Sequence, residues 1–319
     1  MLVIQDAYAT SDLPQGGVAA IGNFDALHTG HRLLLTQAVA RAAELSVPAM
    51  VITFDPHPGT VLRPELPPPI RLNTQEQKER LLEELGVSIL LVVRFTPELA
   101  KTPAPQFVRD FLGARLQPRA VYVGAGFHFG HARQGDLALL QELGQELGFT
   151  AEGVPEVVYR GERISTSRIR QAITEGKVEE AREMLGRPYA IGGVIVRGDR
   201  MGQRLGWPTI NLASDNKLLP ADGVYASRVF FPSYPATFDC VTNIGTRPTV
   251  YENYQRVVES HILDFSANVY KQRVELAFHK RLREERIFPT VMDLSAQIRR
   301  DVEATREFFT RQRQESVEP

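Results

Sequence analysis

The chain has 319 residues, 43% of them hydrophobic, and its formal net charge at pH 7 is −1. This composition excludes a disordered chain, and the length suffices for two domains that each have a core of their own. The near-neutral charge argues against a general nucleic-acid-binding protein. Cys240 is the only cysteine, so no disulfide can form within the chain, which suits a reducing compartment.

The first 15 residues carry Asp6 and Asp12 and lack the basic region of a secretory signal. No apolar run approaches the length of a membrane span. We therefore expect a soluble, cytoplasmic protein that binds neither a membrane nor a nucleic acid.

Strand-like and helix-like patterns alternate in the first half of the chain. Apolar runs predict strands at 18–21, 49–54, 87–95 and 120–123. Amphipathic spacing predicts helices at 32–45, 75–85, 106–112 and 137–147. Such alternation favours a parallel sheet covered by helices, which binds ligands beyond the carboxyl ends of its strands.

Residues 22–31 read Gly-Asn-Phe-Asp-Ala-Leu-His-Thr-Gly-His and join the first predicted strand to its helix. A strand-to-helix junction presents free N–H groups and the positive end of a helix dipole to an anion. His28 and His31 can face the same side of the first helical turn, and Gly30 lets a ligand approach the backbone. Two imidazoles at such a junction suit a triphosphate. A turn with two surface histidines is the alternative, and without a cysteine or third histidine nearby a zinc site has little support.

This stretch resembles the His-x-Gly-His signature of nucleotidylyltransferases, in the form found in bacterial bifunctional riboflavin kinase/FAD synthetases. The resemblance implies that His28 and His31 are catalytic. It also implies that ATP phosphates are bound by Asn23, Phe24, Asp25 and Gly30. One departure is Ala26, where the family usually has glycine.

Three later segments of the first half also resemble motifs of this family. They are Thr-Phe-Asp-Pro-His-Pro at 53–58, the glycine- and aromatic-rich 124–135, and Arg-Ile-Ser-Thr-Ser-Arg-Ile-Arg at 163–170. Taken alone, they are consistent with a rigid turn, a glycine loop and a capped helix start. The resemblance implies flavin binding by Phe54, His57, Phe127, Phe129, Arg133 and Arg163, and phosphate binding by Ser165, Thr166, Ser167 and Arg168. Gly126 stands where the family usually has a polar side chain, and Ser and Thr are exchanged at 166 and 167.

The pattern changes after a helix predicted at 178–185, so we place a domain boundary between 186 and 187. Strand-like runs follow at 190–196, 224–231, 238–241, 257–263 and 273–278, with no helical pattern between them. Many strands without crossover helices favour an antiparallel sheet closed as a barrel. A long amphipathic helix is predicted at 291–309.

Residues 198–211 are rich in glycine, cations and hydroxyl groups, which suits phosphate binding. On an extended segment Thr209 and Asn211 point to the same side, where an oxygen of each can reach one Mg²⁺. The Gly-Lys-Ser/Thr ending of a P-loop is absent from this segment. A solvent-exposed hairpin is the alternative.

The same segment resembles the riboflavin kinase signature Gly-Arg-x-Leu-Gly-Phe-Pro-Thr-Ala-Asn. The resemblance implies phosphate binding by Gly202 and Arg204, a magnesium ion held by Thr209 and Asn211, and Glu259 as the catalytic base near the end of its strand. Gln203, Trp207 and Ile210 replace the Arg, Phe and Ala of the signature. Further segments at 222–225, 243–249, 259–265, 283–285 and 297–298 match the family in order, so the resemblance covers nearly the whole chain.

The predicted fold is an α/β nucleotidylyltransferase domain with a Rossmann-like parallel sheet at 1–186, then an antiparallel β-barrel riboflavin kinase domain with a C-terminal helix at 187–319. The resemblance implies a bifunctional enzyme that uses ATP and Mg²⁺ to convert riboflavin to FMN and then FMN to FAD. Its partners are these small molecules, and we expect a monomer or weak homo-oligomer. Two alternatives are a kinase with a weakened first domain, motivated by Ala26, Ala125 and Gly126, and a non-catalytic flavin-binding regulator.

Overall fold

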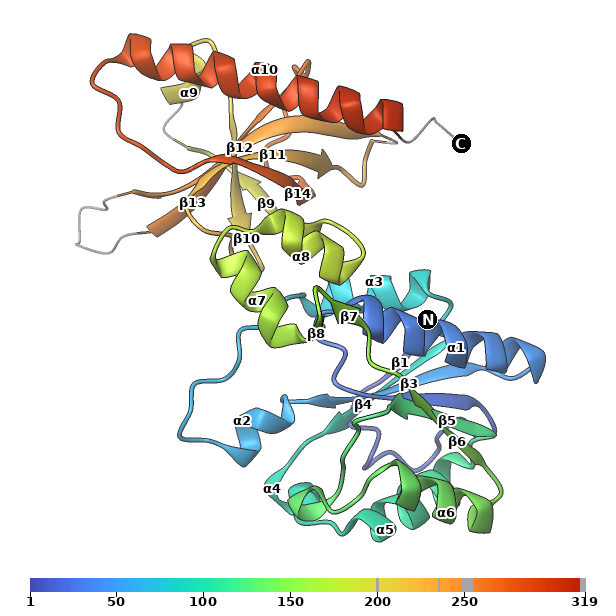
Figure 1. The fold of residues 1–319 in the computed structure, drawn as a ribbon. Coiled ribbons are helices and arrows are strands. Elements are labelled where there is room, and N and C mark those ends of the chain that lie inside the picture. Colours follow the sequence, from blue (N-terminus) through green and yellow to red (C-terminus); the bar gives the residue numbers. More distant parts are fainter. Residues whose placement is uncertain (199–200, 235, 248–254, 316–319) are drawn as a thin grey trace. The chain divides into compact units, whose positions relative to one another are not determined.

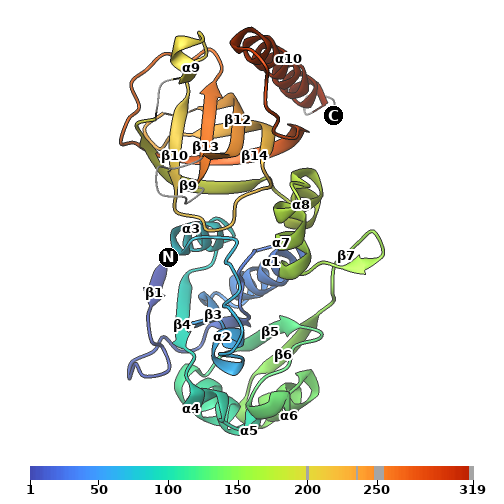
Figure 2. The same ribbon diagram turned by 90° about the vertical axis from the view of Figure 1, so that its left-hand side faces the viewer.

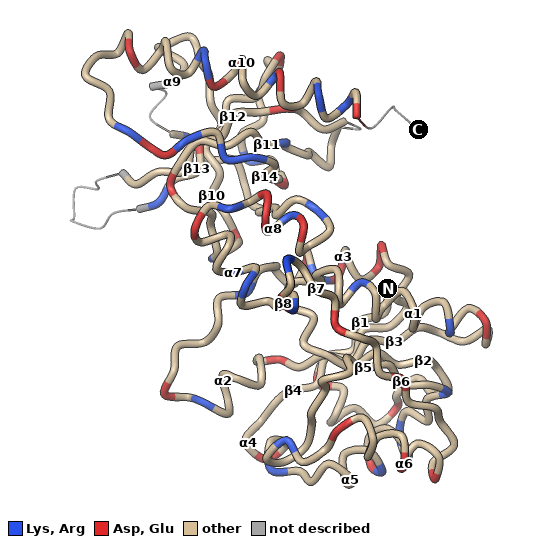
Figure 3. Tube along the Cα trace, viewed as in Figure 1, with Lys and Arg blue, Asp and Glu red and all other residues tan. Residues whose placement is uncertain are grey.

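The computed structural model describes residues 1–198, 201–234, 236–247 and 255–315. The chain forms two compact units, Met1–Ser165 and Thr166–Pro319 (Figure 1). Each unit is described by itself. In both, basic and acidic residues are interspersed along the trace rather than gathered in one segment, as expected for a net charge near zero (Figure 3).

The first unit is built on a six-stranded sheet in the order β1-β4-β3-β2-β5-β6, and every pairing in it is parallel. Its strands are β1 Leu2–Ile4, β2 Val18–Ile21, β3 Ala49–Asp55, β4 Ile89–Arg94, β5 Ala120–Gly124 and β6 Thr150–Val154. From β2 the chain moves to β3 on one side, and it later returns to β5 on the other side. The strand order therefore reverses at β2, where parallel sheets form ligand sites.

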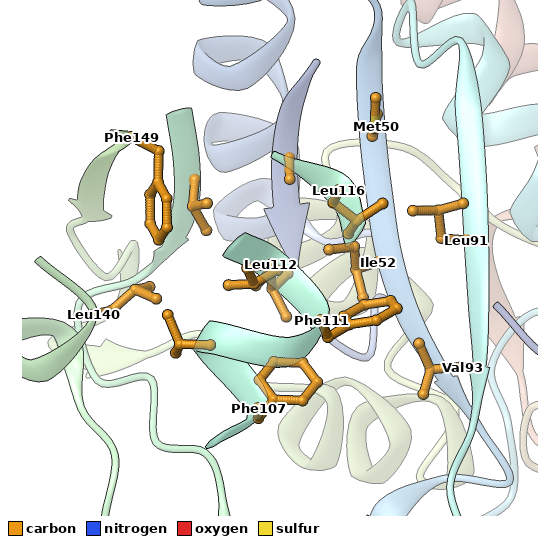
Figure 4. Packing of buried hydrophobic residues seen from close by; sticks show 14 of the residues in the cluster. Met50, Ile52, Leu91, Val93, Phe107, Phe111, Leu112, Leu116, Leu140 and Phe149 are labelled. Atoms are coloured by element: carbon orange, nitrogen blue, oxygen red, sulfur yellow. The ribbon is translucent and has the colours of Figure 1, made fainter. Parts of the chain in front are cut away.

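Helices cover both faces of this sheet. Those on one face are α1 Thr29–Glu44 and α3 Gln75–Glu84, and those on the other are α5 Ala104–Phe107, η1 Val108–Leu116 and α6 Leu137–Leu147. Successive strand residues alternate between the two layers, so Val18 packs under α1 while Ala19 packs in the opposite core. Figure 4 shows the second core, in which Phe107, Phe111 and Leu112 lie against the sheet.

The predicted parallel sheet is confirmed, with local differences. Helix α1 begins at Thr29, three residues before the predicted start, so His28 is its N-cap and His31 lies in its first turn. The helix predicted at 106–112 is a short α5 followed by the π-helical η1, which ends at a left-handed Gln117. Strands β1 and β6 lie at the two edges and were not predicted. The apolar run of β1 is only three residues long, and β6 is of mixed polarity. Short elements without a clear period were also missed: α2 Pro58–Leu62, α4 Pro97–Ala100, η2 His131–Arg133, β7 Val158–Tyr159 and β8 Glu162–Arg163.

The second unit is a closed antiparallel barrel with the strand order β10-β13-β12-β11-β14-β9 (Figure 2). Its strands are β9 Tyr189–Val196, β10 Ile210–Ser214, β11 Gly223–Phe230, β12 Thr237–Arg247, β13 Gln255–Ile262 and β14 Arg273–Arg283. Helix α10 Val291–Glu315 lies outside the wall and contacts β12 and β11. The barrel and its C-terminal helix confirm the prediction for this half.

The segment after Thr209 is the barrel strand β10, which agrees with the extended segment expected there and not with the alternative of a hairpin in solvent. Three details of the second unit differ from the sequence pattern. Strands β12 and β14 are longer than predicted, and Glu259 lies inside β13 rather than near its end. Helices α7 Thr166–Thr174 and α8 Val178–Leu185 group with the barrel because α8 packs on β14 and β9. The structural division therefore precedes residue 186, and the boundary between the two activities stays a prediction.

The barrel interior is partly polar. Ser227, Thr242 and Ser260 are almost completely buried, and Thr242 Oγ1 shares hydrogen bonds with the hydroxyls of Ser227 and Ser260. Burial raises the pKa of the Cys240 thiol to about 12, so the only cysteine is not a nucleophile at neutral pH.

Candidate active sites

The two histidines of the first unit stack at the start of α1. Their ring centroids lie 3.7 Å apart with an interplanar angle of 14°. His28 caps the helix, and its Nδ1 accepts a hydrogen bond from the backbone N–H of His31 at 3.2 Å. This bond assigns the proton of neutral His28 to Nε2, which can donate to an anion. The structure thus brings together His28, His31 and a helix N-terminus, as the sequence predicts.

The turn before α1 is held by buried apolar groups. Phe24 is completely buried and its ring meets the ring of His31 edge-on at 5.3 Å. The buried ring of Phe24 therefore positions His31, and the predicted role of Phe24 in binding ATP phosphates stays a prediction. Ala26 is fully buried and lacks a positive φ angle, unlike Phe24 and Leu27. Because its backbone conformation suits any L-residue, the departure from glycine at 26 does not strain the motif.

Gly30 lies close to the ring of His28. A Cβ at this position would meet His28 Cε1 at 3.2 Å and Nδ1 at 3.3 Å. A larger residue at 30 would press on the stacked rings, so glycine preserves their geometry.

A cleft lies at the carboxyl ends of β2 and β3. Residues 72–78 form hydrogen bonds with the residues that line one side of it. The backbone N–H of Leu72 donates to Asp25 Oδ1 at 3.1 Å, and Asn73 Nδ2 donates to Asp25 O at 2.8 Å. Lys78 Nζ donates to Asn23 O at 3.0 Å and to Thr53 Oγ1 at 2.8 Å. The carboxylate of Asp25 therefore fixes the backbone here, and its predicted role with ATP phosphates stays a prediction.

His57 and Phe54 line the same cleft. His57 caps α2 by accepting a bond from the N–H of Gly59 at 3.0 Å, and its Nε2 lies 3.3 Å from Asn23 Nδ2. The neighbouring Arg71 forms an ion pair with Asp55. Lys78 and Arg71 were missed by the sequence analysis, since cations on or beside an amphipathic helix are usually solvated.

The loop after β5 carries the other predicted flavin residues. Phe127 and Phe129 stack at 5.4 Å and pack against the core, whereas Arg133 is exposed. Arg163 pairs with Glu156 at 2.6 Å, close to Gly126. Gly126 does not have a positive φ angle. The structure gathers Phe127, Gly126 and Arg163 near one strand end, and their contacts with a flavin stay predictions.

The predicted phosphate motif at 165–168 crosses the division between the two units. Ser165 ends the first unit, and α7 begins at Thr166 in the second. Its role with ATP stays a prediction.

In the second unit, three polar residues form a row across neighbouring strands. Glu259 of β13 pairs directly with Asn211 of β10 on one side and with Asn243 of β12 on the other. Residues directly opposite each other in antiparallel strands share a face, with Cβ atoms about 4.5–5.5 Å apart. All three side chains are partly exposed. The carboxylate predicted to be a base thus lies between two amides.

Two cavities meet at this row. One contains Thr209 and Asn211, together with Gln203, Ser260 and Tyr270. The other contains Glu259 and Asn243 within a largely apolar wall formed by Leu205, Trp207, Val241, Phe288, Leu294 and Ile298. Thr209 lines both cavities. As the spacing predicts, Thr209 and Asn211 face one cavity.

The loop before β10 turns tightly at Gly202. The N–H of Trp207 donates to Gly202 O at 2.8 Å, and a Cβ at 202 would meet Trp207 O at 2.4 Å. Gly202 lines the cavity of Glu259, whereas Arg204 is exposed and is not among the described lining residues of either cavity. The phosphate contacts predicted for Gly202 and Arg204 stay predictions. The motif residues 199–200 and 248–249 lie outside the described residues.

Comparison with protein families matches both halves of the chain. The model described as FAD synthetase matches residues 10–168, and the model described as riboflavin kinase matches residues 185–309. A bifunctional riboflavin kinase/FMN adenylyltransferase of Escherichia coli K12 is 37% identical over 310 residues, covering 97% of this chain and 98% of that protein. The protein of the same name from Haemophilus influenzae is 34% identical over 309 residues, covering 97% and 99%.

One solved structure shares the arrangement of nearly the entire chain. It is described as a macrolide-efflux protein from Streptococcus pneumoniae, with 28% identity, a TM-score of 0.86, and coverage of 96% of this chain and 98% of that one. Among the described residues of the present chain, no helix is both long and apolar enough to cross a membrane.

Proposed function

The chain belongs to the family of bifunctional riboflavin kinase/FMN adenylyltransferases, and from this premise we propose how its two units divide the work. It phosphorylates riboflavin with ATP to give FMN, and it transfers AMP from a second ATP to FMN to give FAD and pyrophosphate. We assign the phosphorylation to the barrel unit and the adenylyl transfer to the parallel-sheet unit, with the boundary between the activities near residue 186.

In the barrel, the two cavities separate the two substrates. The flavin ring occupies the apolar cavity, where Trp207, Leu294 and Ile298 offer surfaces for a flat ring, and ATP phosphates enter the cavity of Asn211. The riboflavin hydroxyl is a poor nucleophile while it keeps its proton. Glu259 accepts that proton as the new bond to phosphorus forms. The observation that supports this best is Thr209, which lines both cavities and marks where the reacting groups meet.

The donors at the predicted magnesium site fit the ion. Thr209 and Asn211 supply a hydroxyl and an amide oxygen, which are hard and neutral ligands. Neutral donors suit a cation that brings most of its ligands from water and the phosphates of the nucleotide. When bound, Mg²⁺ would offset the charge of the transferring phosphate.

Adenylyl transfer requires no nucleophile from the protein, because the FMN phosphate is already an anion. The task of the first unit is therefore to align two anions and to stabilise the charge that develops on the leaving pyrophosphate. The stacked His28 and His31 at the N-terminus of α1 can supply N–H donors for this charge. Asn23 is exposed beside them, and Gly30 is partly exposed.

The alternative of a kinase with a failed first unit has weak support. Ala26 fits its backbone without strain, so this departure gives no structural reason to expect a loss of activity. Gly126 is the remaining departure with a chemical consequence, because it lacks a side chain that could bond the substrate. We further propose that the protein acts in the cytoplasm as a monomer or weak homo-oligomer.

A time course separates the possibilities. Purified protein is incubated with riboflavin, ATP and MgCl₂, and the flavins are separated at intervals, with an EDTA-treated sample as control. FMN followed by FAD supports both assignments, FMN alone supports the kinase-only alternative, and unchanged riboflavin supports a non-catalytic flavin binder.

A further inference from the structure

The cleft at the carboxyl ends of β2 and β3 contains a partly buried cation, Lys78. Its two hydrogen-bond partners, the carbonyl of Asn23 and the hydroxyl of Thr53, are both neutral. Within the described residues no carboxylate forms an ion pair with Lys78, and the nearby carboxylate of Asp25 accepts its hydrogen bond from Leu72. Buried charges in folded proteins are ordinarily paired, because removing an ion from water is costly.

The ammonium has capacity for one more acceptor. A lysine carries three N–H donors, and two are used by Asn23 and Thr53. Lys78 of α3 lines the cleft together with His57, the N-cap of α2, and Arg71 from the loop between these helices. The carboxylates of Asp25 and Asp55 also line the cleft, and Asp55 is paired with Arg71. The cleft opens where β2 and β3 end, beside the turn that carries the two histidines.

We propose that Lys78 binds a phosphate group of a substrate in this cleft and is the anion-recognition residue for adenylyl transfer. The inference rests on the proposed assignment of that reaction to the first unit. Both substrates of the reaction carry phosphate, so the ligand is either the phosphate of FMN or the triphosphate of ATP. An anion here would accept the third N–H of Lys78, which its two neutral hydrogen-bond partners leave available.

The charges around Lys78 predict a pH dependence of substrate affinity, which makes the proposal testable. The pKa of Lys78 is lowered from its ordinary 10.5 to about 8, chiefly because burial disfavours the charged form. The Arg71 guanidinium contributes to this lowering, and the carboxylates of Asp25, Asp55 and Glu79 oppose it. An anion binds better to the protonated form, so its affinity falls as the pH rises through 8, where neither the substrate phosphates nor an ordinary histidine titrates.

The test measures FAD formation from FMN and ATP between pH 6.5 and 9.5. The KM for each substrate is determined at saturation with the other, for the wild type, Lys78→Met, Lys78→Arg and the matched control Lys101→Met, which changes an exposed lysine of the same unit. In the wild type, one of the two KM values rises roughly tenfold between pH 7 and pH 9. The substrate that shows the rise is the one whose phosphate Lys78 binds.

The variants separate recognition from a structural role. Lys78→Met raises that KM about 10–100-fold at pH 7 and abolishes its rise with pH. Lys78→Arg restores part of the affinity and also gives a flat profile, since arginine stays charged. Lys101→Met behaves as the wild type, and all variants phosphorylate riboflavin normally because that site lies in the other unit.

Two results would overturn the proposal: KM values of the wild type that stay constant to pH 9.5, or an unaltered KM in Lys78→Met. If Lys78→Met fails to fold, the pH dependence of KM in the wild type and in Lys78→Arg still tests the proposal. A wild type that makes no FAD contradicts the assignment of adenylyl transfer itself. FAD formation with flat profiles contradicts only the role of Lys78.

Discussion

Trp207 and Ser295 are joined by a hydrogen bond of 3.2 Å from indole Nε1 to the serine Oγ, which ties the loop before β10 to helix α10. Trp207 also meets the ring of His261 at 5.4 Å, edge to face. The loop and the first turns of α10 both line the apolar cavity that contains Glu259. A phenylalanine, which the family signature has at this position, cannot make the bond.

We therefore expect Trp207→Phe to raise the KM for riboflavin about fivefold, because one hydrogen bond is worth about 1 kcal/mol. Ser295→Ala removes the same bond from the other side. The double variant should lose no more than either single variant, and a double-mutant cycle measures this. Strictly additive losses would mean that the two side chains act independently.

His31→Ala tests the division of labour between the units. Removing one donor to the developing charge should slow FAD formation from FMN about 10²–10³-fold. Riboflavin phosphorylation should be nearly unchanged, since the barrel is a separate compact unit. The two rates are measured on the same preparation, and an equal loss of both in a folded variant argues against the assignment.

Gly126→Asn tests whether the absence of a polar side chain at this position weakens FMN binding. Because Gly126 has no positive φ, the backbone accepts asparagine without strain. Its Cβ would lie 3.2 Å from Glu156 Oε1, so the neighbouring side chain must move by a few tenths of an ångström. We expect a lower KM for FMN in FAD synthesis. Gly126→Asp is the matched control, since it places a second carboxylate beside Glu156 and should bind the anionic substrate less well. An unchanged or higher KM in the asparagine variant would show that this loop has other partners.

The elements with strong periodicity were predictable from the sequence. The buried run Val18–Ile21 and the amphipathic Leu137–Leu147 appear where the pattern places them. The edge strand Leu2–Ile4 was not predicted, because a run of three apolar residues is too short to indicate a strand. The bounds of the strand Ile210–Ser214 were not predicted either, because its residues are of mixed polarity. The π-helical turn at Val108–Leu116 depends on tertiary packing, which local propensity does not encode.

For the sites, residue types and order were predictable but the partners were not. The stack of His28 on His31 follows from their three-residue spacing. The row of Asn211, Glu259 and Asn243 follows from strand register, which is set by the closure of the barrel. Lys78 was not predicted as a site residue because a lysine on an amphipathic helix ordinarily faces water. Only the fold shows that it lines a cleft.

The buried His279 should make the stability of the barrel sensitive to acid. The pKa of His279 is lowered to about 4, chiefly by burial and also by Arg228 and Arg182, while Asp239 opposes them. The unfolded chain protonates this ring near pH 6.5. Its contribution to stability is therefore complete above pH 6.5 and is lost as the pH falls from 6.5 to 4, by on the order of 2–3 kcal/mol.

The variant His279→Phe keeps a planar ring against Phe309 and cannot be protonated. We expect its free energy of unfolding to fall less than that of the wild type over this pH range. Trp207 is the only tryptophan and lies in the barrel unit, so its fluorescence during urea unfolding reports this unit. Parallel pH profiles for the two proteins would exclude His279 as the cause.

Glu259→Gln tests the kinase site most directly. The substitution keeps the shape of the side chain between Asn211 and Asn243 but removes the group that accepts a proton. We expect the rate of FMN formation to fall about 10²–10⁴-fold, the range for loss of general base catalysis. The KM for riboflavin should change little, because the apolar cavity walls are intact.

FAD formation from supplied FMN serves as the internal control, since it depends on the other unit. Asn243→Asp is a second control, because it adds a carboxylate directly across β13 from Glu259. Repulsion between the two carboxylates raises the pKa of the pair and should move the acid limb of the kinase pH profile upward. A wild-type rate of riboflavin phosphorylation in Glu259→Gln would show that another group takes the proton, and the assignment of the base would then be wrong.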